Sequence, residues 1–167
     1  MRILIEGPDG SGKTTLSKIL INKGYHYIHS AKPDCSIDEY TKKEISNLIS
    51  HTNIVMDRGV ISNIVYSSVF NDTDMVSSDL FYEELSLIDV IVLAIPFDKE
   101  EYLNKFNKLK NRRDEEYSCM ENIYDEFRTQ RLFKDVLLNK KVVYYDMNLI
   151  KKENVMTFVE KEILNVD

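Results

Sequence analysis

The sequence predicts an α/β fold in which a five-stranded parallel sheet is covered by helices on both faces. Short apolar runs alternate with segments of helical periodicity along the chain, and the connections between them are short. The expected strands are 2–6, 25–29, 53–56, 89–95 and 142–145. Such alternation implies right-handed crossovers, and a parallel sheet of this kind binds its ligand at the carboxyl ends of the strands.

Each element follows from its own pattern. Residues 2–6 are an apolar run that stops at a glycine turn, and 11–23 shows helical spacing at Leu16, Ile19 and Leu20. Residues 89–95 are almost entirely apolar, which is typical of a parallel strand covered on both faces, and Pro96 ends that run. The other helices are expected at 37–49, 60–70, 80–87, across most of the charged segment 99–138, and at 153–164.

Length and charge limit the function classes. The 167 residues fit one domain, 1–167, and the net charge of -6 disfavours broad adhesion to nucleic acid or to an anionic membrane. The sequence has no signal-peptide core and no apolar run long enough to span a membrane, so we expect a cytoplasmic protein. Cys35 and Cys119 lack a metal-ligand spacing and are expected to stay reduced.

One motif carries most of the chemistry. The segment GPDGSGKT, residues 7–14, satisfies G-x-x-x-x-G-K-[ST] directly after an expected strand and before an expected helix. In such a loop, backbone N–H groups and the helix dipole face a phosphate, a lysine reaches the outer phosphates and a Ser or Thr ligates Mg²⁺. We therefore expect ATP and Mg²⁺ as ligands, with Lys13 and Thr14 in these two roles. The expected ATP-binding residues are Gly7, Asp9, Gly10, Ser11, Gly12, Lys13, Thr14 and Thr15.

Two longer motifs make the resemblance more specific. The opening EGPDGSGKTT resembles the EGxDGxGKTT of thymidylate kinases, and DRGVISNIVY, residues 57–66, resembles their DRYxxSxxAY, with Gly59 in place of the aromatic residue. Weaker similarities are Ala31-Lys32-Pro33, where the family has Arg-Glu-Pro, and Arg112-Arg113 before a charged helix, where the family has a lid. Segment 37–51 lacks the arginine with which the family reads thymine.

The resemblance implies a three-layer P-loop NTPase fold with a small helical lid at about 108–116. It implies transfer of the γ-phosphoryl group of ATP to a nucleoside monophosphate, dTMP or a related deoxypyrimidine monophosphate first. Asp57 is expected to hold Mg²⁺ through water, together with Thr14, or to orient Arg58. The implied catalytic residues are Lys13, Arg58, Arg112 and Arg113, and the implied acceptor-binding residues are Asp9, Lys32, Arg58, Ser62 and Tyr66.

Other interpretations remain open at this point. The chain could be a deoxynucleoside kinase, a polynucleotide 5′-kinase or a non-catalytic nucleotide-binding regulator, and a homodimer is left open. Charge favours a monophosphate acceptor, because Lys32 and Arg58 follow neighbouring strands and cations are needed to bring two anionic groups together. A nucleoside kinase needs a carboxylate base instead, which Asp34 could supply.

Overall fold

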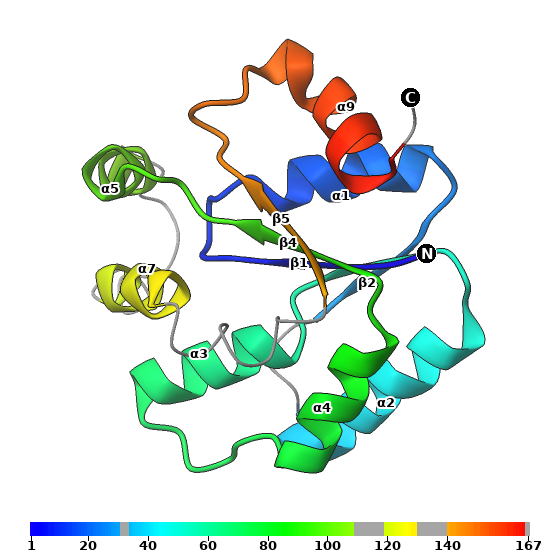
Figure 1. Ribbon diagram of the computed structural model, residues 1–167. Helices are drawn as coiled ribbons and strands as arrows, with labels where there is room; N and C mark the ends of the chain where they lie inside the picture. The colour runs from blue at the N-terminus through cyan, green and yellow to red at the C-terminus, as the bar shows by residue number, and fades with distance from the viewer. Residues whose placement is uncertain (31–33, 109–118, 130–139, 166–167) are drawn as a thin grey trace.

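The computed structural model describes residues 1–30, 34–108, 119–129 and 140–165, and it confirms the α/β fold (Figure 1). All strands run parallel, in the order β2-β3-β1-β4-β5. Each strand begins and ends within one residue of the expected bounds. The strands are β1 (Arg2–Glu6), β2 (His26–His29), β3 (Ile54–Asp57), β4 (Val90–Ala94) and β5 (Lys141–Tyr145).

The helices also lie where the sequence predicts them. Helix α1 begins later than the expected 11–23, because Gly12 still has a left-handed backbone with φ 93°. Within the expected helical segment 99–138, residues 109–118 and 130–139 lie outside the described part of the chain. The helices are α1 (Lys13–Asn22), α2 (Ile37–Ser50), α3 (Val60–Phe70), α4 (Ser78–Leu87), α5 (Lys99–Lys108), α7 (Met120–Arg128) and α9 (Val155–Phe158), the last between a 3₁₀ turn (Lys152–Asn154) and a π turn (Val159–Ile163).

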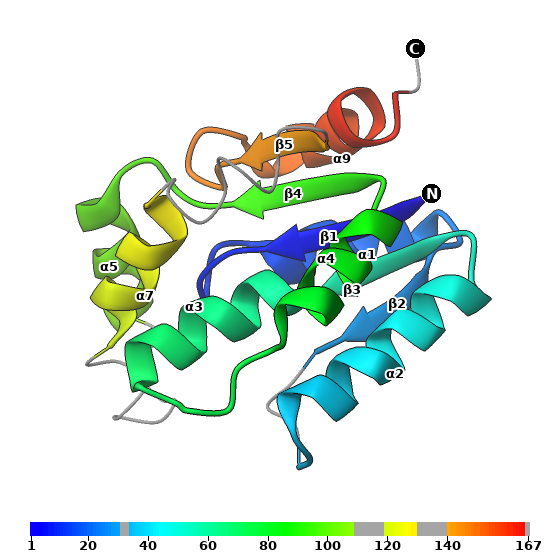
Figure 2. The ribbon, with the colours of Figure 1, turned by 60° about the horizontal axis from the view of Figure 1, so that its bottom comes forward.

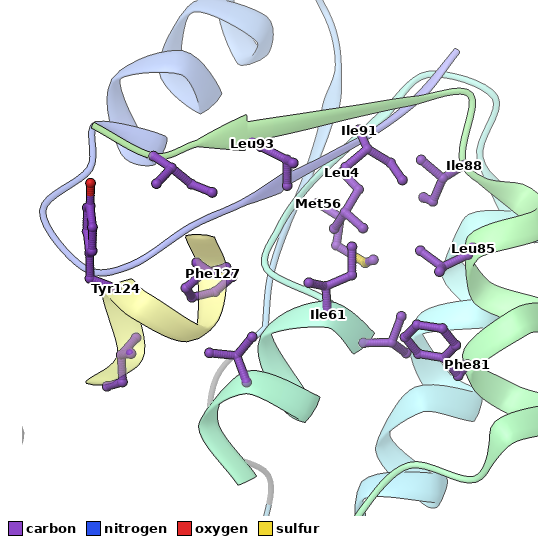
Figure 3. Close-up of a cluster of buried hydrophobic side chains, with 14 of the residues drawn as sticks. Leu4, Met56, Ile61, Phe81, Leu85, Ile88, Ile91, Leu93, Tyr124 and Phe127 are labelled. Atoms are coloured by element: carbon purple, nitrogen blue, oxygen red, sulfur yellow. The ribbon is translucent and has the colours of Figure 1, made fainter. Parts of the chain in front are cut away.

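The helices form a layer on each side of the sheet. Helices α1 and α9 cover one face and α2, α3 and α4 cover the other, while α5 and α7 lie beyond the carboxyl ends of the strands (Figures 1 and 2). Successive residues of β1 point to opposite faces, so Ile3 and Ile5 belong to one apolar cluster and Leu4 to the other. Figure 3 shows Leu4, Met56 and Ile91 of the sheet packed against Ile61 and Leu85 of the helices.

The strand register places the loops of interest side by side. Ile5 of β1 is level with Asp57 of β3 and with Val92 of β4, and Asp57 is also level with His29 of β2. The loops that leave β1, β2 and β3 therefore start at the same edge of the sheet. None of the helices in the described ranges is long and apolar enough to cross a membrane.

The packing of the core predicts that a buried and an exposed leucine differ in how much their replacement by alanine lowers stability. Leu4 is fully buried in the cluster between the sheet and helices α2, α3 and α4, whereas Leu149 is 70% exposed. Leu4→Ala should lower the free energy of unfolding by about 2–5 kcal/mol, because it leaves a cavity in a closely packed core. Leu149→Ala should leave stability within about 0.5 kcal/mol. Urea denaturation followed by circular dichroism measures both, and equal effects would contradict this packing.

Candidate active site

The motif GPDGSGKT connects β1 to α1, the context that a phosphate-binding loop requires. The ammonium of Lys13 lies against the loop itself, where Nζ donates hydrogen bonds of 2.7 Å each to the carbonyl oxygens of Gly7 and Pro8. Burial and, to a smaller extent, the neighbouring charge of Arg58 lower the pKa of Lys13 to about 8. The first turn of α1, with the exposed Thr14 and Thr15, opens toward solvent beside this cation.

Arg58 begins the turn after β3 with a positive φ of 74°, a conformation that costs energy for a residue with a side chain. The conformation is held by a backbone hydrogen bond of 2.9 Å from Arg58 N to Ile5 O. Its guanidinium donates to the carboxylate of Asp9 in the phosphate loop and lies 4.7 Å from the ring centre of Tyr66. The structure thus brings together three predicted acceptor-site residues, Asp9, Arg58 and Tyr66.

A buried carboxyl group holds the same turn from below. Glu6 is fully buried at the end of β1 and accepts hydrogen bonds from Gly59 N at 2.9 Å, from Ser62 N at 3.2 Å and from the Ser62 hydroxyl. Burial raises the pKa of Glu6 to about 7, although the hydrogen bonds from Ser62 act in the opposite direction. Ser62, predicted from the sequence to bind the acceptor, uses its hydroxyl to support the Arg58 turn.

Asp57 ends β3 and is almost entirely buried. Its Oδ2 accepts a hydrogen bond of 3.2 Å from the Tyr27 hydroxyl and lies 3.8 Å from His29 Nδ1. Its Oδ1 is buried without a hydrogen-bond partner among the described residues. A buried acceptor of this kind is costly unless something donates to it, and a metal-bound water can do so.

These residues fit Mg²⁺ bound mainly by phosphate and water. The described residues contain no group of three or more His, Cys, Asp or Glu side chains that could hold a metal by themselves. Mg²⁺ usually keeps several waters and takes one or two protein ligands together with substrate phosphates. The exposed side of Thr14 and the unpartnered Oδ1 of Asp57 fit that pattern.

Helix α5 supports the phosphate loop from the other side, a contact that the sequence analysis missed. The Tyr102 hydroxyl donates a hydrogen bond of 2.5 Å to the carbonyl of Asp9, and a Cβ built on Gly10 would lie 3.2 Å from the Phe106 ring. Tyr102 also stacks on Tyr124 of α7, with ring centres 5.2 Å apart. The only signal in the sequence is the spacing of Tyr102 and Phe106, which by itself indicates no more than a buried helix face.

Gly59 is explained by its neighbours. A Cβ added there would lie 2.6 Å from Glu84 Oε1 and 2.7 Å from Met56 Cε, so that no side chain fits without rearrangement. Glu84 Oε1 in turn accepts a hydrogen bond of 3.0 Å from Val60 N. The buried Glu84 on α4 therefore helps to explain why position 59 holds glycine, where the resembled motif has an aromatic residue.

Several predicted site residues are not placed by the structure. Lys32, Arg112 and Arg113 lie outside the described residues, as does the expected lid 108–116 except for Lys108. Lys108 is the last residue of α5. The roles of these residues stay predictions.

Comparison with known proteins identifies the fold. No protein-family model and no curated protein sequence matches the chain. The YorR protein of Bacillus subtilis, solved in complex with phosphorylated GDP, is similar with a TM-score of 0.73 and 18% identity over 95% of this chain and 93% of that one. Deoxyadenosine kinase from M. mycoides with bound dATP has a TM-score of 0.66 and 18% identity, and the match covers 99% of this chain and 100% of that one.

A third solved structure belongs to the family that the motifs resemble. Thymidylate kinase from Candida albicans is similar with a TM-score of 0.60 and 21% identity over 98% of this chain and 91% of that one. The matches extend over nearly the whole of each chain, and the five-stranded parallel sheet carries the GPDGSGKT loop at the carboxyl end of β1. The chain therefore has the fold of the P-loop nucleoside and nucleotide kinases.

Proposed function

We propose that this protein transfers the γ-phosphoryl group of ATP to a nucleoside monophosphate, with a deoxypyrimidine monophosphate such as dTMP as the first acceptor to test. One observation carries the proposal: Arg58 lies beside the phosphate loop, bound to Asp9, near enough for its charge to lower the pKa of Lys13. Two cations at one point suit a reaction between two anionic phosphate groups.

The donor side uses the phosphate loop. Backbone N–H groups of 7–15 and the start of α1 would hold the phosphates of ATP, and Lys13 would exchange its two carbonyl partners for phosphate oxygens. Thr14 and, through water, Asp57 would hold Mg²⁺, which would neutralise part of the negative charge of the phosphates. These are the roles that the sequence motif predicts for Lys13 and Thr14.

The acceptor side uses the turn after β3. Arg58 would contact the acceptor phosphate, and Asp9 would contact a sugar hydroxyl. Tyr66, which lies beside Arg58 and in edge contact with Phe127, would contact the base. Ser62 and Glu6 would keep this turn in place. Lys32 beside the acceptor and Arg112 and Arg113 over the transferring group complete the proposal.

The chemistry requires little beyond these positions. An oxygen of the acceptor phosphate is already ionised near neutral pH, so no base is needed to activate it. The bond from that oxygen to the γ-phosphorus forms while the bond between the γ-phosphorus and the β–γ bridging oxygen breaks. The products are ADP and a nucleoside diphosphate, and arginines at the transferring group stabilise the charge that develops.

A deoxynucleoside kinase is the second candidate. A deoxyadenosine kinase is among the similar structures, and the buried Oδ1 of Asp57, which has no hydrogen-bond partner in the described part of the chain, could accept a proton from a neutral hydroxyl. A polynucleotide 5′-kinase and a non-catalytic nucleotide-binding regulator remain the other outcomes. The acidic net charge does not favour a nucleic-acid substrate, and we expect the protein to act in the cytoplasm.

Product analysis tests the proposal. The protein is incubated with ATP, Mg²⁺ and one acceptor at a time, from thymidine, dTMP, the other deoxynucleotides and a 5′-hydroxyl oligonucleotide, and products are separated by ion-exchange chromatography. Formation of a diphosphate from a monophosphate is the expected result. Phosphorylation of nucleosides alone would indicate a deoxynucleoside kinase, and phosphorylation of oligonucleotide ends alone would indicate a polynucleotide 5′-kinase. No product from any acceptor would indicate a non-catalytic regulator.

Lys13→Ala should abolish this turnover without unfolding the protein, because the hydrogen bonds of the ammonium to described residues go to the carbonyls of its own loop and not to the apolar core. Lys18→Ala is the matched control, since Lys18 lies on the same helix with its side chain exposed. Turnover and the circular dichroism melt are measured on the same samples. Turnover retained by Lys13→Ala, or lost equally in Lys18→Ala, would refute the role of Lys13.

Arg58→Ala should lower kcat/KM for the acceptor by about a hundredfold or more, while the affinity for ATP changes little. Arg58→Lys should recover only part of the loss, because an ammonium cannot reproduce the planar pair of donors of a guanidinium. Initial rates with varied acceptor, together with ATP binding by calorimetry, separate the two effects. An equal loss of ATP affinity in Arg58→Ala would place Arg58 on the donor side instead.

A further inference from the structure

A group of buried glutamates that the proposed reaction does not use lies beneath the Arg58 turn. Glu6 of β1, Glu44 of α2 and Glu84 of α4 are each at most 2% exposed. Helices α2 and α4 pack side by side on the same face of the sheet (Figures 1 and 2). Buried carboxyl groups are uncommon unless they are paired with cations or hydrogen-bonded, so the group requires a physical explanation.

Two of these glutamates connect the loops on the acceptor side. Glu84 Oε1 accepts a hydrogen bond of 3.0 Å from Val60 N, directly after the Arg58–Gly59 turn. Glu44 accepts a hydrogen bond from the hydroxyl of Ser30, which follows β2, and Ser30 N donates to Asp57 O at 3.1 Å. The two carboxyl groups also lie within hydrogen-bonding reach of each other, so that the pair links the end of β2 to the start of α3.

The surroundings of the pair are acidic rather than basic. Neither Glu44 nor Glu84 forms an ion pair with any Lys, Arg or His in the described ranges. The other elements packed against them present Glu6 from β1, whose charge reaches Glu84, and the neutral donors Ser30 and Val60 N. On α2 itself, the Thr41 hydroxyl is buried without a partner among the described residues.

Without a proton the pair could not be satisfied. Both Oε2 atoms are buried and accept no hydrogen bond from any described donor, and two ionised carboxylates offer only acceptors to each other. Burial raises the pKa of Glu44 to about 7, and burial together with the charge of Glu44 raises the pKa of Glu84 well above its ordinary range. Two like charges in a buried site do not both ionise until the pH is well above the usual carboxyl range.

We propose that Glu44 and Glu84 share one proton and that this protonated pair positions the Arg58 turn for the acceptor. Both are positioning residues, because they act on the acceptor through Val60, Ser30 and the turn between them. The inference about Arg58 rests on the proposed function, whereas the proton shared by the pair does not. A pair that loses its last proton places two repelling charges under the turn.

The tight fit at Gly59 transmits any movement of the pair. A Cβ on Gly59 would lie only 2.6 Å from Glu84 Oε1, so there is little free space between the carboxyl and the turn. Displacement of Glu84 would remove the acceptor of Val60 N and leave a buried N–H without a partner, which is unfavourable. The phosphate loop is held by other groups, among them Tyr102, and should be much less affected.

The direction of the pH effect follows from the raised pKa values. The folded protein binds these protons more tightly than the unfolded chain, so stability falls as pH rises above the ordinary carboxyl pKa of 4.5. For Glu44 the fall continues to about pH 7, where the folded protein also loses the proton. In Glu84→Gln, the side chain at position 84 is neutral at every pH, keeps an acceptor for Val60 N and can donate to Glu44. The stability of this variant should therefore fall less than that of the wild type as the pH rises.

The first experiment needs no substrate. The melting temperature and the backbone amide resonances of Gly59 and Val60 are followed by pH titration in wild type, Glu84→Gln, Glu44→Gln and the control Glu83→Gln, an exposed residue of the same helix. Both amides should shift together with one apparent pKa well above 4.5 in wild type and in Glu83→Gln, and the shift should be lost in Glu84→Gln. An unchanged titration in Glu84→Gln would overturn the proposal. If that variant does not fold, the same comparison with Glu44→Gln decides.

The second experiment tests positioning through kinetics. The KM for the acceptor in wild type should rise by about tenfold between about pH 6 and about pH 9, the size expected from one lost hydrogen bond, while the KM for ATP stays level. Glu84→Gln should flatten the acceptor profile and Glu83→Gln should keep it. Identical profiles in all three proteins would overturn the positioning role. Absence of any kinase product would count against the proposed function, and the amide titration would still decide whether the pair shares a proton.

Discussion

Parallel pairing of β1 with β3 is the constraint on which the site depends. It places Ile5 level with Asp57, so the next residue of β1, Glu6, lies beside the turn at Gly59 and Ser62. The phosphate loop begins immediately after Glu6 and the Arg58 turn immediately after Asp57. The register of β1 on β3 therefore brings together the segments that carry Lys13 and Arg58, independently of any contact between their side chains.

That geometry is maintained against two unfavourable features. Arg58 has a left-handed backbone, and the buried carboxyl group of Glu6 forms no ion pair with a Lys, Arg or His of the described ranges. Each would be costly alone, but together they offset one another, since the N–H groups exposed by the turn are the donors that Glu6 needs. In this strained backbone conformation, the guanidinium of Arg58 reaches the carboxylate of Asp9 in the loop after β1.

The sequence predicted the strands and helices correctly, and it singled out the G-x-x-x-x-G-K-T segment between β1 and α1, because both depend on local patterns. Apolar runs identify the buried strands, and the G-x-x-x-x-G-K-T spacing identifies the loop that follows β1. It could not predict the buried glutamates, because the other acids of the same two helices are not buried, and only the packing of α2 on α4 distinguishes Glu44 and Glu84 from them. The same limit applies to Ser62, whose spacing from Tyr66 fits the acceptor site but whose hydroxyl binds Glu6.

The contact between Gly59 and Glu84 also restricts how this chain can diverge from proteins with an aromatic residue after the Asp-Arg pair. A larger residue at 59 meets both Glu84 Oε1 and Met56 Cε, whereas a smaller residue at 84 relieves only the first of these contacts and removes the acceptor of Val60 N. A side chain at 59 is therefore expected to cost less stability once the residues at 84 and 56 leave room for it. Substitutions at 59 and 84, twenty-five residues apart in the chain, are expected to have non-additive effects on stability.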